Sequence, residues 1–139
     1  MPDPGTILYV EDEESDVFFM RRAFEGEGLE RSLQTVGDGQ EAISYLSGEG
    51  IYGERERYPV PVLVLLDLNL PVVSGFEVLQ WMRQGACKAL PVVVFSSSPR
   101  PEDVLKAREL GADDYVEKPN SAFRFQEVVR DLKERWLAH

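Results

Sequence analysis

The sequence contains very little of what disulfides, zinc sites and membrane spans require. Cys87 is the single cysteine and His139 the single histidine among 139 residues, which rules out an internal disulfide and leaves too few ligands for a typical zinc site. The longest apolar run, residues 60–66, is interrupted by Pro61 and is too short to cross a bilayer. Residues 1–5 lack the basic and apolar segments of a secretory signal. We therefore expect a cytoplasmic protein that is not embedded in a membrane.

Basic patches are also scarce. The chain has 15 Lys and Arg residues against 25 Asp and Glu residues, a net charge of −10. Arg55 and Arg57 alternate with Glu54 and Glu56, and no compact basic surface is visible elsewhere. Because such a surface repels phosphates, we do not expect nucleic-acid binding. The acidic excess favours a cationic ligand or a positively charged protein partner.

What the sequence does contain is an alternation of short β-rich segments with helical ones. We expect strands at residues 6–10, 33–36, 62–66, 91–95 and 115–116, and helices at residues 15–26, 39–46, 74–83, 101–110 and 121–137. Ser15 and Asp16 are candidate caps of the first helix, and residues 48–61 are expected to form an extended loop. This order predicts an α/β protein of the (βα)₅ flavodoxin-like type, with a parallel sheet in the order 2-1-3-4-5 and helices on both faces. We expect residues 1–139 to form one domain, with a core over about 6–137 and no output domain.

Polar side chains follow four of these strands. Glu11 and Asp12 follow the first strand, Asp67 the third, Ser96 the fourth and Lys118 the fifth. Because the carboxyl ends of parallel strands meet at one edge, we expect these side chains to lie close together. Three carboxylates need a cation, and oxygen ligands suit Mg²⁺, with Mn²⁺ as the alternative. Asp67 could then act as a nucleophile toward phosphorus, with Lys118 and Ser96 contacting phosphoryl oxygens.

In these positions the chain resembles the receiver domains of bacterial two-component response regulators. The matching motifs are Glu11-Asp12, the run Leu66-Asp67-Leu68-Asn69-Leu70-Pro71 with Gly75 after it, Val94-Phe95-Ser96-Ser97-Ser98, Gly111-Ala112-Asp113-Asp114-Tyr115 and Lys118-Pro119. The resemblance implies that Asp67 is the phospho-acceptor. It also implies that Asp12, Asp67 and the Asn69 backbone carbonyl ligate the metal, and that Glu11 supports the metal through water.

By the same resemblance, Ser96 and Tyr115 form the switch pair of the family, with serine in place of the commoner threonine. A core aromatic role is the alternative for Tyr115. The resemblance implies a signalling phospho-acceptor rather than an enzyme, with only weak self-phosphorylation and self-dephosphorylation. Its phosphoryl donor would be a sensor histidine kinase, and its output would pass through protein contacts or a histidine phosphotransfer protein.

Two finer hypotheses concern partners. The run at residues 67–71, the long loop before the third strand and the terminal Arg135-Trp136-Leu137 most resemble regulators paired with phytochrome-type kinases. Phe123 lies two positions from Phe125, roughly 200° around the last helix, so only one of the two rings can face the core. Phe123 is therefore an interface candidate, or else a ring tucked in locally. The face formed by the fourth helix, fifth strand and fifth helix is the candidate surface for a homodimer.

Two alternatives remain open. Phosphatases of the haloacid dehalogenase type also combine an Asp, Mg²⁺ and a Lys, but they need a second Asp two residues on, where this chain has Asn69, and their nucleophile ends the first strand. A receiver-like binding module that never carries a phosphoryl group is the other alternative.

Overall fold

The computed structural model describes residues 4–85, 87–97 and 100–137, so the predictions concerning Ser98 and His139 fall outside it. The described elements are, in chain order, β1 (Ile7–Val10), α1 (Glu14–Gly26), η1 (Glu30–Ser32), β2 (Leu33–Val36), α2 (Gly39–Ser47), η2 (Gly50–Gly53), β3 (Leu63–Leu66), α3 (Gly75–Gln84), β4 (Val92–Ser96), α4 (Pro101–Glu109), β5 (Asp114–Glu117) and α5 (Ala122–Trp136). The strands form one parallel sheet in the order β2-β1-β3-β4-β5. The predicted fold and strand order are therefore confirmed.

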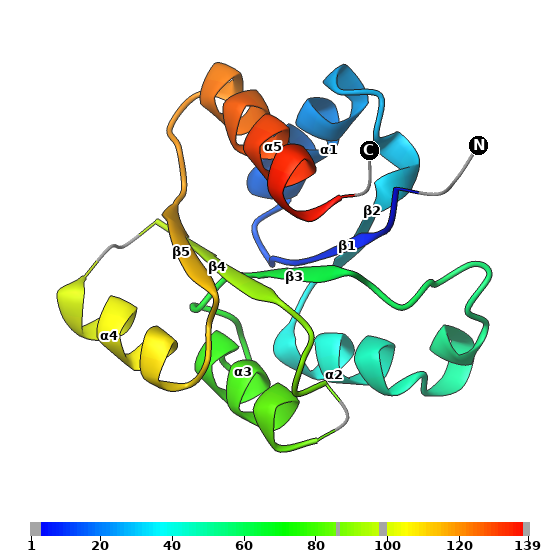
Figure 1. Ribbon diagram of the computed structural model, residues 1–139, viewed down its shortest axis with the longest axis vertical. Helices are drawn as coiled ribbons and strands as arrows, with labels where there is room; N and C mark the ends of the chain where they lie inside the picture. Colours follow the sequence, from blue (N-terminus) through cyan, green and yellow to red (C-terminus); the bar gives the residue numbers. More distant parts are fainter. Residues whose placement is uncertain (1–3, 86, 98–99, 138–139) are drawn as a thin grey trace.

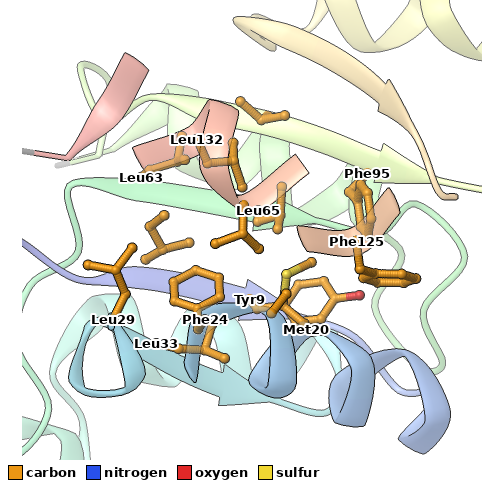
Figure 2. Close-up of a cluster of buried hydrophobic side chains, with 14 of the residues drawn as sticks. Tyr9, Met20, Phe24, Leu29, Leu33, Leu63, Leu65, Phe95, Phe125 and Leu132 are labelled. Carbon is orange, nitrogen blue, oxygen red and sulfur yellow. The ribbon is translucent and has the colours of Figure 1, made fainter. Parts of the chain in front are cut away.

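Helices cover both faces of this sheet (Figure 1). Successive residues of a strand point to opposite faces, and β1 follows this rule with all four side chains buried. Ile7 and Tyr9 join the cluster beneath α1 and α5, which Figure 2 shows, whereas Leu8 and Val10 join the cluster beneath α2 and α3. The continuous apolar runs of β1, β3 and β4 are thus explained by burial on both sides.

Side-chain caps are present at the starts of α2, α3 and α5, but not at those of α1 and α4. Side chains of Asp38, Ser74 and Ser121 accept hydrogen bonds from backbone N–H groups at the starts of α2, α3 and α5. In α1 the N-cap position is Glu13, which makes no side-chain cap. The prediction that Ser15 and Asp16 cap this helix is therefore wrong. A physical reason is that the carboxylate of Asp16 pairs with a lysine instead.

The expected extended loop at 48–61 is more ordered than predicted, since it contains the 3₁₀ turn η2. The rings of Tyr45, Tyr52 and Tyr58 pack against one another, with centroids 4.9 to 6.1 Å apart. Arg55 donates to the carbonyl oxygens of Tyr45, Leu46 and Tyr58. The packed tyrosine rings and the hydrogen bonds of Arg55 therefore order the loop at 48–61 despite its polar composition.

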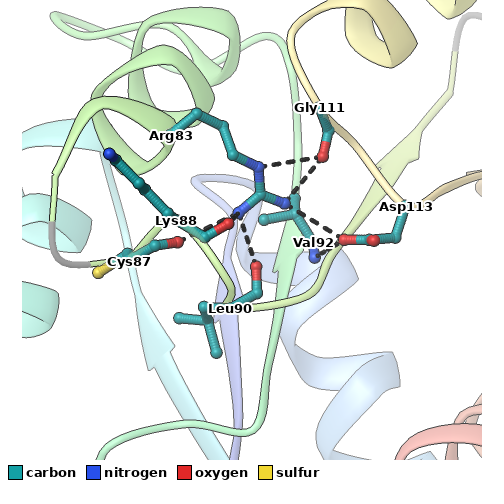
Figure 3. Close-up of polar contacts among 7 residues, drawn as sticks. All are labelled: Arg83, Cys87, Lys88, Leu90, Val92, Gly111 and Asp113. Atoms are coloured by element: carbon teal, nitrogen blue, oxygen red, sulfur yellow. Dashed lines mark hydrogen bonds and ion pairs between the residues drawn. The ribbon is translucent and has the colours of Figure 1, made fainter.

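Arg83, near the end of α3, connects this helix to the loops on either side of β4 and α4 through hydrogen bonds (Figure 3). Its Nη1 donates to the carbonyl oxygens of Cys87, Lys88 and Leu90, the last at 2.8 Å. Its Nη2 donates to Gly111 O at 2.8 Å and to Asp113 at 3.2 Å. One half-buried guanidinium therefore joins the α3–β4 loop to the α4–β5 loop.

The outer edge of β5 is partly closed by the chain's own side chains. Asp114 Oδ1 accepts from the backbone N–H of Tyr115 at 2.8 Å, and its Oδ2 accepts from Arg135 at 2.8 Å. Lys118 N–H bonds to Ser96 O of β4. Since the donors of a strand alternate in direction, the N–H of Tyr115 faces away from β4.

No helix in the described part of the chain is long and apolar enough to span a bilayer.

Candidate functional site

Three carboxylates meet where β1 and β3 end. The two strands lie side by side with Val10 opposite Leu66, so the residues that follow them, Glu11 and Asp67, emerge at the same edge. One oxygen from each of Glu11, Asp12 and Asp67 lies within 4.8 Å of the others. Glu11 and Asp67 are buried, whereas Asp12 is exposed. The structure therefore brings together the three acidic residues predicted from the sequence, and we call them the acidic triad.

The carboxylate of Glu11 is the most enclosed member of the triad. Tyr9 donates its hydroxyl to Glu11 Oε1 at 3.0 Å, and the N–H of Glu13 donates to Oε2 at 3.2 Å. Burial raises the pKa of Glu11 to about 7, against the opposing effect of its hydrogen bond with Lys118. Burial also raises the pKa of Tyr9, with the negative charge of Glu11 adding to the effect. Tyr9 therefore stays protonated and acts as a fixed donor to Glu11.

Lys118 lies against the triad but also against a fourth carboxylate. Its Nζ is 2.6 Å from Glu11, 2.9 Å from Asp16 and 3.5 Å from Asp67. Burial acts to lower the pKa of Lys118, but the hydrogen bonds to Glu11 and Asp16 outweigh it and the pKa is raised. Lys118 is therefore a permanent positive charge at this edge.

The sequence reasoning assigned Asp16 to a helix cap and missed its contact with Lys118. No local pattern indicated this contact, because Lys118 follows Asp16 by 102 positions.

The turn that carries Asp67 is tightly built. The N–H of Asn69 donates to Asp67 Oδ1 at 3.4 Å, and Asn69 itself is exposed. A Cβ at position 75 would come within 2.2 Å of the Asp67 carbonyl oxygen, so only glycine lets α3 start this close to the strand end. Val72 has a φ of 67°, a strained conformation for a β-branched residue.

Ser96 and Tyr115 lie on neighbouring strands beside Asp67. Ser96 is the last residue of β4 and is buried, while Tyr115 of β5 is partly buried. Burial raises the pKa of Tyr115, and a side-chain hydrogen bond with Ser96 acts in the opposite direction. The two residues predicted as a switch pair are therefore already linked to each other.

The donor set fits a hard divalent cation. The triad offers only oxygen ligands, and its exposed member Asp12 leaves a side open to solvent. Such ligands favour Mg²⁺ or Mn²⁺ over zinc, which prefers nitrogen and sulfur. The Lys118 ammonium pairs with two members of the triad, Glu11 and Asp67. The arrangement can thus balance the charge of a bound cation and of an incoming anion.

Residues 7–130 match the family model of the response regulator receiver domain. The chain belongs to this receiver family. The curated relatives include the probable methanogenesis regulatory protein FilR2 of Methanothrix harundinacea, 39% identical over 97% of this chain and 85% of its own length. Response regulator Rcp1 of Synechocystis is 33% identical over 96% of this chain and 90% of its own length.

Solved structures of receiver proteins give the same picture. The Mn²⁺-bound form of Rcp1 superimposes with a TM-score of 0.83 over 96% of this chain and 95% of its own. The phosphorylated cyanobacterial phytochrome response regulator RcpA superimposes with a TM-score of 0.85 at 33% identity, over 97% of this chain and 99% of its own. This receiver domain is therefore similar to phytochrome-associated response regulators.

This receiver domain exposes two aromatic rings, one on α1 and one at the start of α5. Phe123 is 73% exposed and Phe18 is 54% exposed. They line a shallow groove of about 340 Å³ between α1 and α5, together with Phe19, Arg22 and Gln126. The structure thus places Phe123 outside the core, whereas Phe125 is buried.

Proposed function

We propose that this receiver domain is a single-domain response regulator that accepts a phosphoryl group from a histidine kinase on Asp67. The observation that carries the proposal is the buried Asp67 carboxylate beside Glu11 and Asp12, with Lys118 Nζ at 3.5 Å. The reaction takes place in the cytoplasm. The signal then leaves through a changed surface, or the phosphoryl group passes to a histidine phosphotransfer protein.

The chemistry assigns each residue a part. A carboxylate oxygen of Asp67 attacks the phosphorus of a phosphohistidine, an O–P bond forms, the N–P bond breaks and the imidazole leaves with the electron pair. Lys118 and the Ser96 hydroxyl donate to phosphoryl oxygens as charge builds on them. Because Ser96 also bonds to Tyr115, movement of its hydroxyl toward the phosphoryl group would release the tyrosine. That release is the proposed switch.

A divalent cation completes this site. Glu11 (through water), Asp12, Asp67 and the Asn69 backbone carbonyl would hold it; Mg²⁺ is the expected ion and Mn²⁺ the alternative, as in the Mn²⁺-bound structure of Rcp1. When bound, the cation neutralises the carboxylates and the phosphoryl oxygens. The only turnover that we propose is slow self-phosphorylation from small donors and slow self-dephosphorylation. Asn69 cannot serve as the second acid that a haloacid dehalogenase phosphatase needs.

Intact mass after incubation with acetyl phosphate and Mg²⁺ tests the acceptor. We expect the native protein to gain one phosphoryl group, Asp67→Ala to gain none, and Asp131→Asn, an exposed aspartate of α5, to behave as the native protein. An adduct on Asp67→Ala would refute the assignment. If no variant forms an adduct, and Mg²⁺ binds but beryllofluoride does not, the chain is a phosphorylation-independent binding module.

The kinase is proposed to be of the phytochrome type, because the phytochrome response regulator RcpA has the same fold and matches this chain over 97% of it and 99% of its own length. Phosphotransfer from a panel of purified, autophosphorylated kinases tests this proposal. We expect the fastest transfer from phytochrome-type kinases. Faster transfer from a kinase that does not sense light would overturn it.

A second copy of the chain is the proposed partner for the face formed by α4, β5 and α5. Leu105 is 60% exposed on α4, and Phe123 is exposed in the first turn of α5, where it borders the groove toward α1 at the margin of this face. Sedimentation with and without beryllofluoride should show weaker self-association for Leu105→Asp and Phe123→Asp than for Ile51→Asp, an equally exposed change in η2. Unchanged association in Phe123→Asp would remove Phe123 from the interface.

A further inference from the structure

The ammonium group of Lys118 has its three donors directed at three different carboxylates. Two of these partners, Glu11 and Asp67, belong to the acidic triad and are needed by a bound cation. The third, Asp16, stands on α1 outside the triad, and its carboxylate lies 2.9 Å from Nζ. Asp16 is therefore the one anionic partner that Lys118 keeps when the triad is occupied.

We propose that Asp16 is a positioning residue that holds Lys118 at the rim of the acidic triad, so that the triad oxygens remain available to the cation. This inference rests on the proposed function and extends it to a residue that takes no part in binding the metal. Without the Asp16 carboxylate, the ammonium is attracted by Glu11 and Asp67 alone and moves deeper among their oxygens. There it competes with a divalent cation for the same ligands.

The same contact acts on an incoming anion in the opposite sense. While Asp16 holds Lys118, a phosphoryl group must share the ammonium with a carboxylate that also repels it. Lys118 is 8% exposed and Asp16 is 24% exposed, so water screens this interaction only in part. Removal of the Asp16 charge should therefore weaken cation binding and strengthen anion binding. Loss of packing or of fold would weaken both.

Helix capping does not account for Asp16. The N-cap position of α1 is Glu13, and Asp16 lies inside the first turn, where any acidic residue gains a small benefit from the helix dipole. Glu14 shares that turn and that charge. Among the described residues, Glu14 makes no ion pair within 4.0 Å. It therefore offers a matched control for the loss of one negative charge near the site.

The experiment compares the native protein with Asp16→Asn, Asp16→Glu and Glu14→Gln. Mg²⁺ affinity is measured by isothermal titration calorimetry with no phosphoryl donor present. Beryllofluoride affinity is measured by ¹⁹F NMR at saturating Mg²⁺. For Asp16→Asn we expect Mg²⁺ to bind about three- to tenfold more weakly and beryllofluoride to bind about threefold more tightly, on the scale of one partly screened charge. Glu14→Gln should change either affinity by less than about twofold, and Asp16→Glu should lie between the native protein and Asp16→Asn.

Each other outcome has a distinct meaning. If both affinities fall in Asp16→Asn, the residue has a merely structural role and the inference is overturned. If Asp16→Asn and Glu14→Gln agree, only the general field matters and the inference is overturned as well. If the native protein binds Mg²⁺ but no beryllofluoride, the proposed function fails. The role of Asp16 is then tested by the Mg²⁺ measurements alone. Weaker Mg²⁺ binding in Asp16→Asn than in Glu14→Gln supports this role, and equal binding refutes it.

Discussion

Arg83 lends itself to a quantitative prediction, because its guanidinium bridges two loops (Figure 3). Substitution by methionine keeps most of the aliphatic stem and removes every polar contact. The two shortest bonds, to Leu90 O and Gly111 O, are both 2.8 Å long. A hydrogen bond to a charged donor contributes about 1.5 kcal/mol or more when it is shielded from water. The side chain of Arg83 is 19% exposed, so we assign about 1.5 kcal/mol to each of the two bonds. Arg83→Met should therefore lower the free energy of unfolding by about 3 kcal/mol.

Chemical denaturation with urea, followed by circular dichroism, measures this loss. For a chain of this size it corresponds to a fall in Tm of roughly 10 °C. Arg83→Lys should lose about 2 kcal/mol, because a single ammonium does not reach both loops as the planar guanidinium does. The control is Arg100→Met. The ion pairs of Arg100 with Glu102 and Asp103 lie at the surface, so this variant should change the free energy of unfolding by less than about 0.5 kcal/mol. If Arg83→Met unfolds within about 0.5 kcal/mol of the native protein, the two loops are held by something other than this side chain.

Three further predictions concern the site. Burial raises the pKa of Glu11 from 4.5 to about 7, so between these pH values the folded state binds more protons than the unfolded state. In EDTA, the free energy of unfolding of the native protein should therefore fall relative to that of Glu11→Gln as the pH rises from 4.5 to 7. Urea denaturation at each pH measures this difference. Gly75→Ala should lower the free energy of unfolding by more than about 2 kcal/mol, because the added Cβ would clash with the backbone at Asp67. Gly37→Ala adds its Cβ in open space and should lower it by less than about 1 kcal/mol. Val72→Asn should raise the free energy of unfolding by about 1 kcal/mol, because asparagine tolerates a positive φ; a lower value would show that Val72 is not strained.

The sequence was sufficient to predict the sheet order and the members of the acidic triad. Both follow from rules that act along the chain: apolar runs buried on two faces define the strands, and the residues that end parallel strands meet at one edge. For that reason Glu11, Asp67 and Lys118 could be brought together without coordinates. The side-chain caps at Asp38, Ser74 and Ser121 obey an equally local rule, because each of these side chains bonds to a backbone N–H three residues further on.

Features that depend on pairing between distant segments could not be read in this way. Asp16 satisfies the local rule for a helix cap, but a lysine 102 positions later takes its carboxylate. Arg83 shows no signal of its bridging role, since two of its acceptors, Gly111 and Asp113, follow it by 28 and 30 residues. The loop at 48–61 has a polar composition, and its order comes from the packing of its two tyrosines on Tyr45 and from the hydrogen bonds of Arg55. In each case tertiary contacts decided among several locally acceptable conformations.

The side chain of Asp114 has a consequence for how copies of this protein can meet. A bare edge strand recruits strands of other chains through main-chain hydrogen bonds, which is a route to fibrils. At β5 that route is obstructed, because Asp114 already occupies the outward donor of Tyr115 and is itself held by Arg135. Two copies that meet at this edge therefore do so mainly through side-chain contacts, which can be specific and reversible. They are less able to extend the sheet strand by strand.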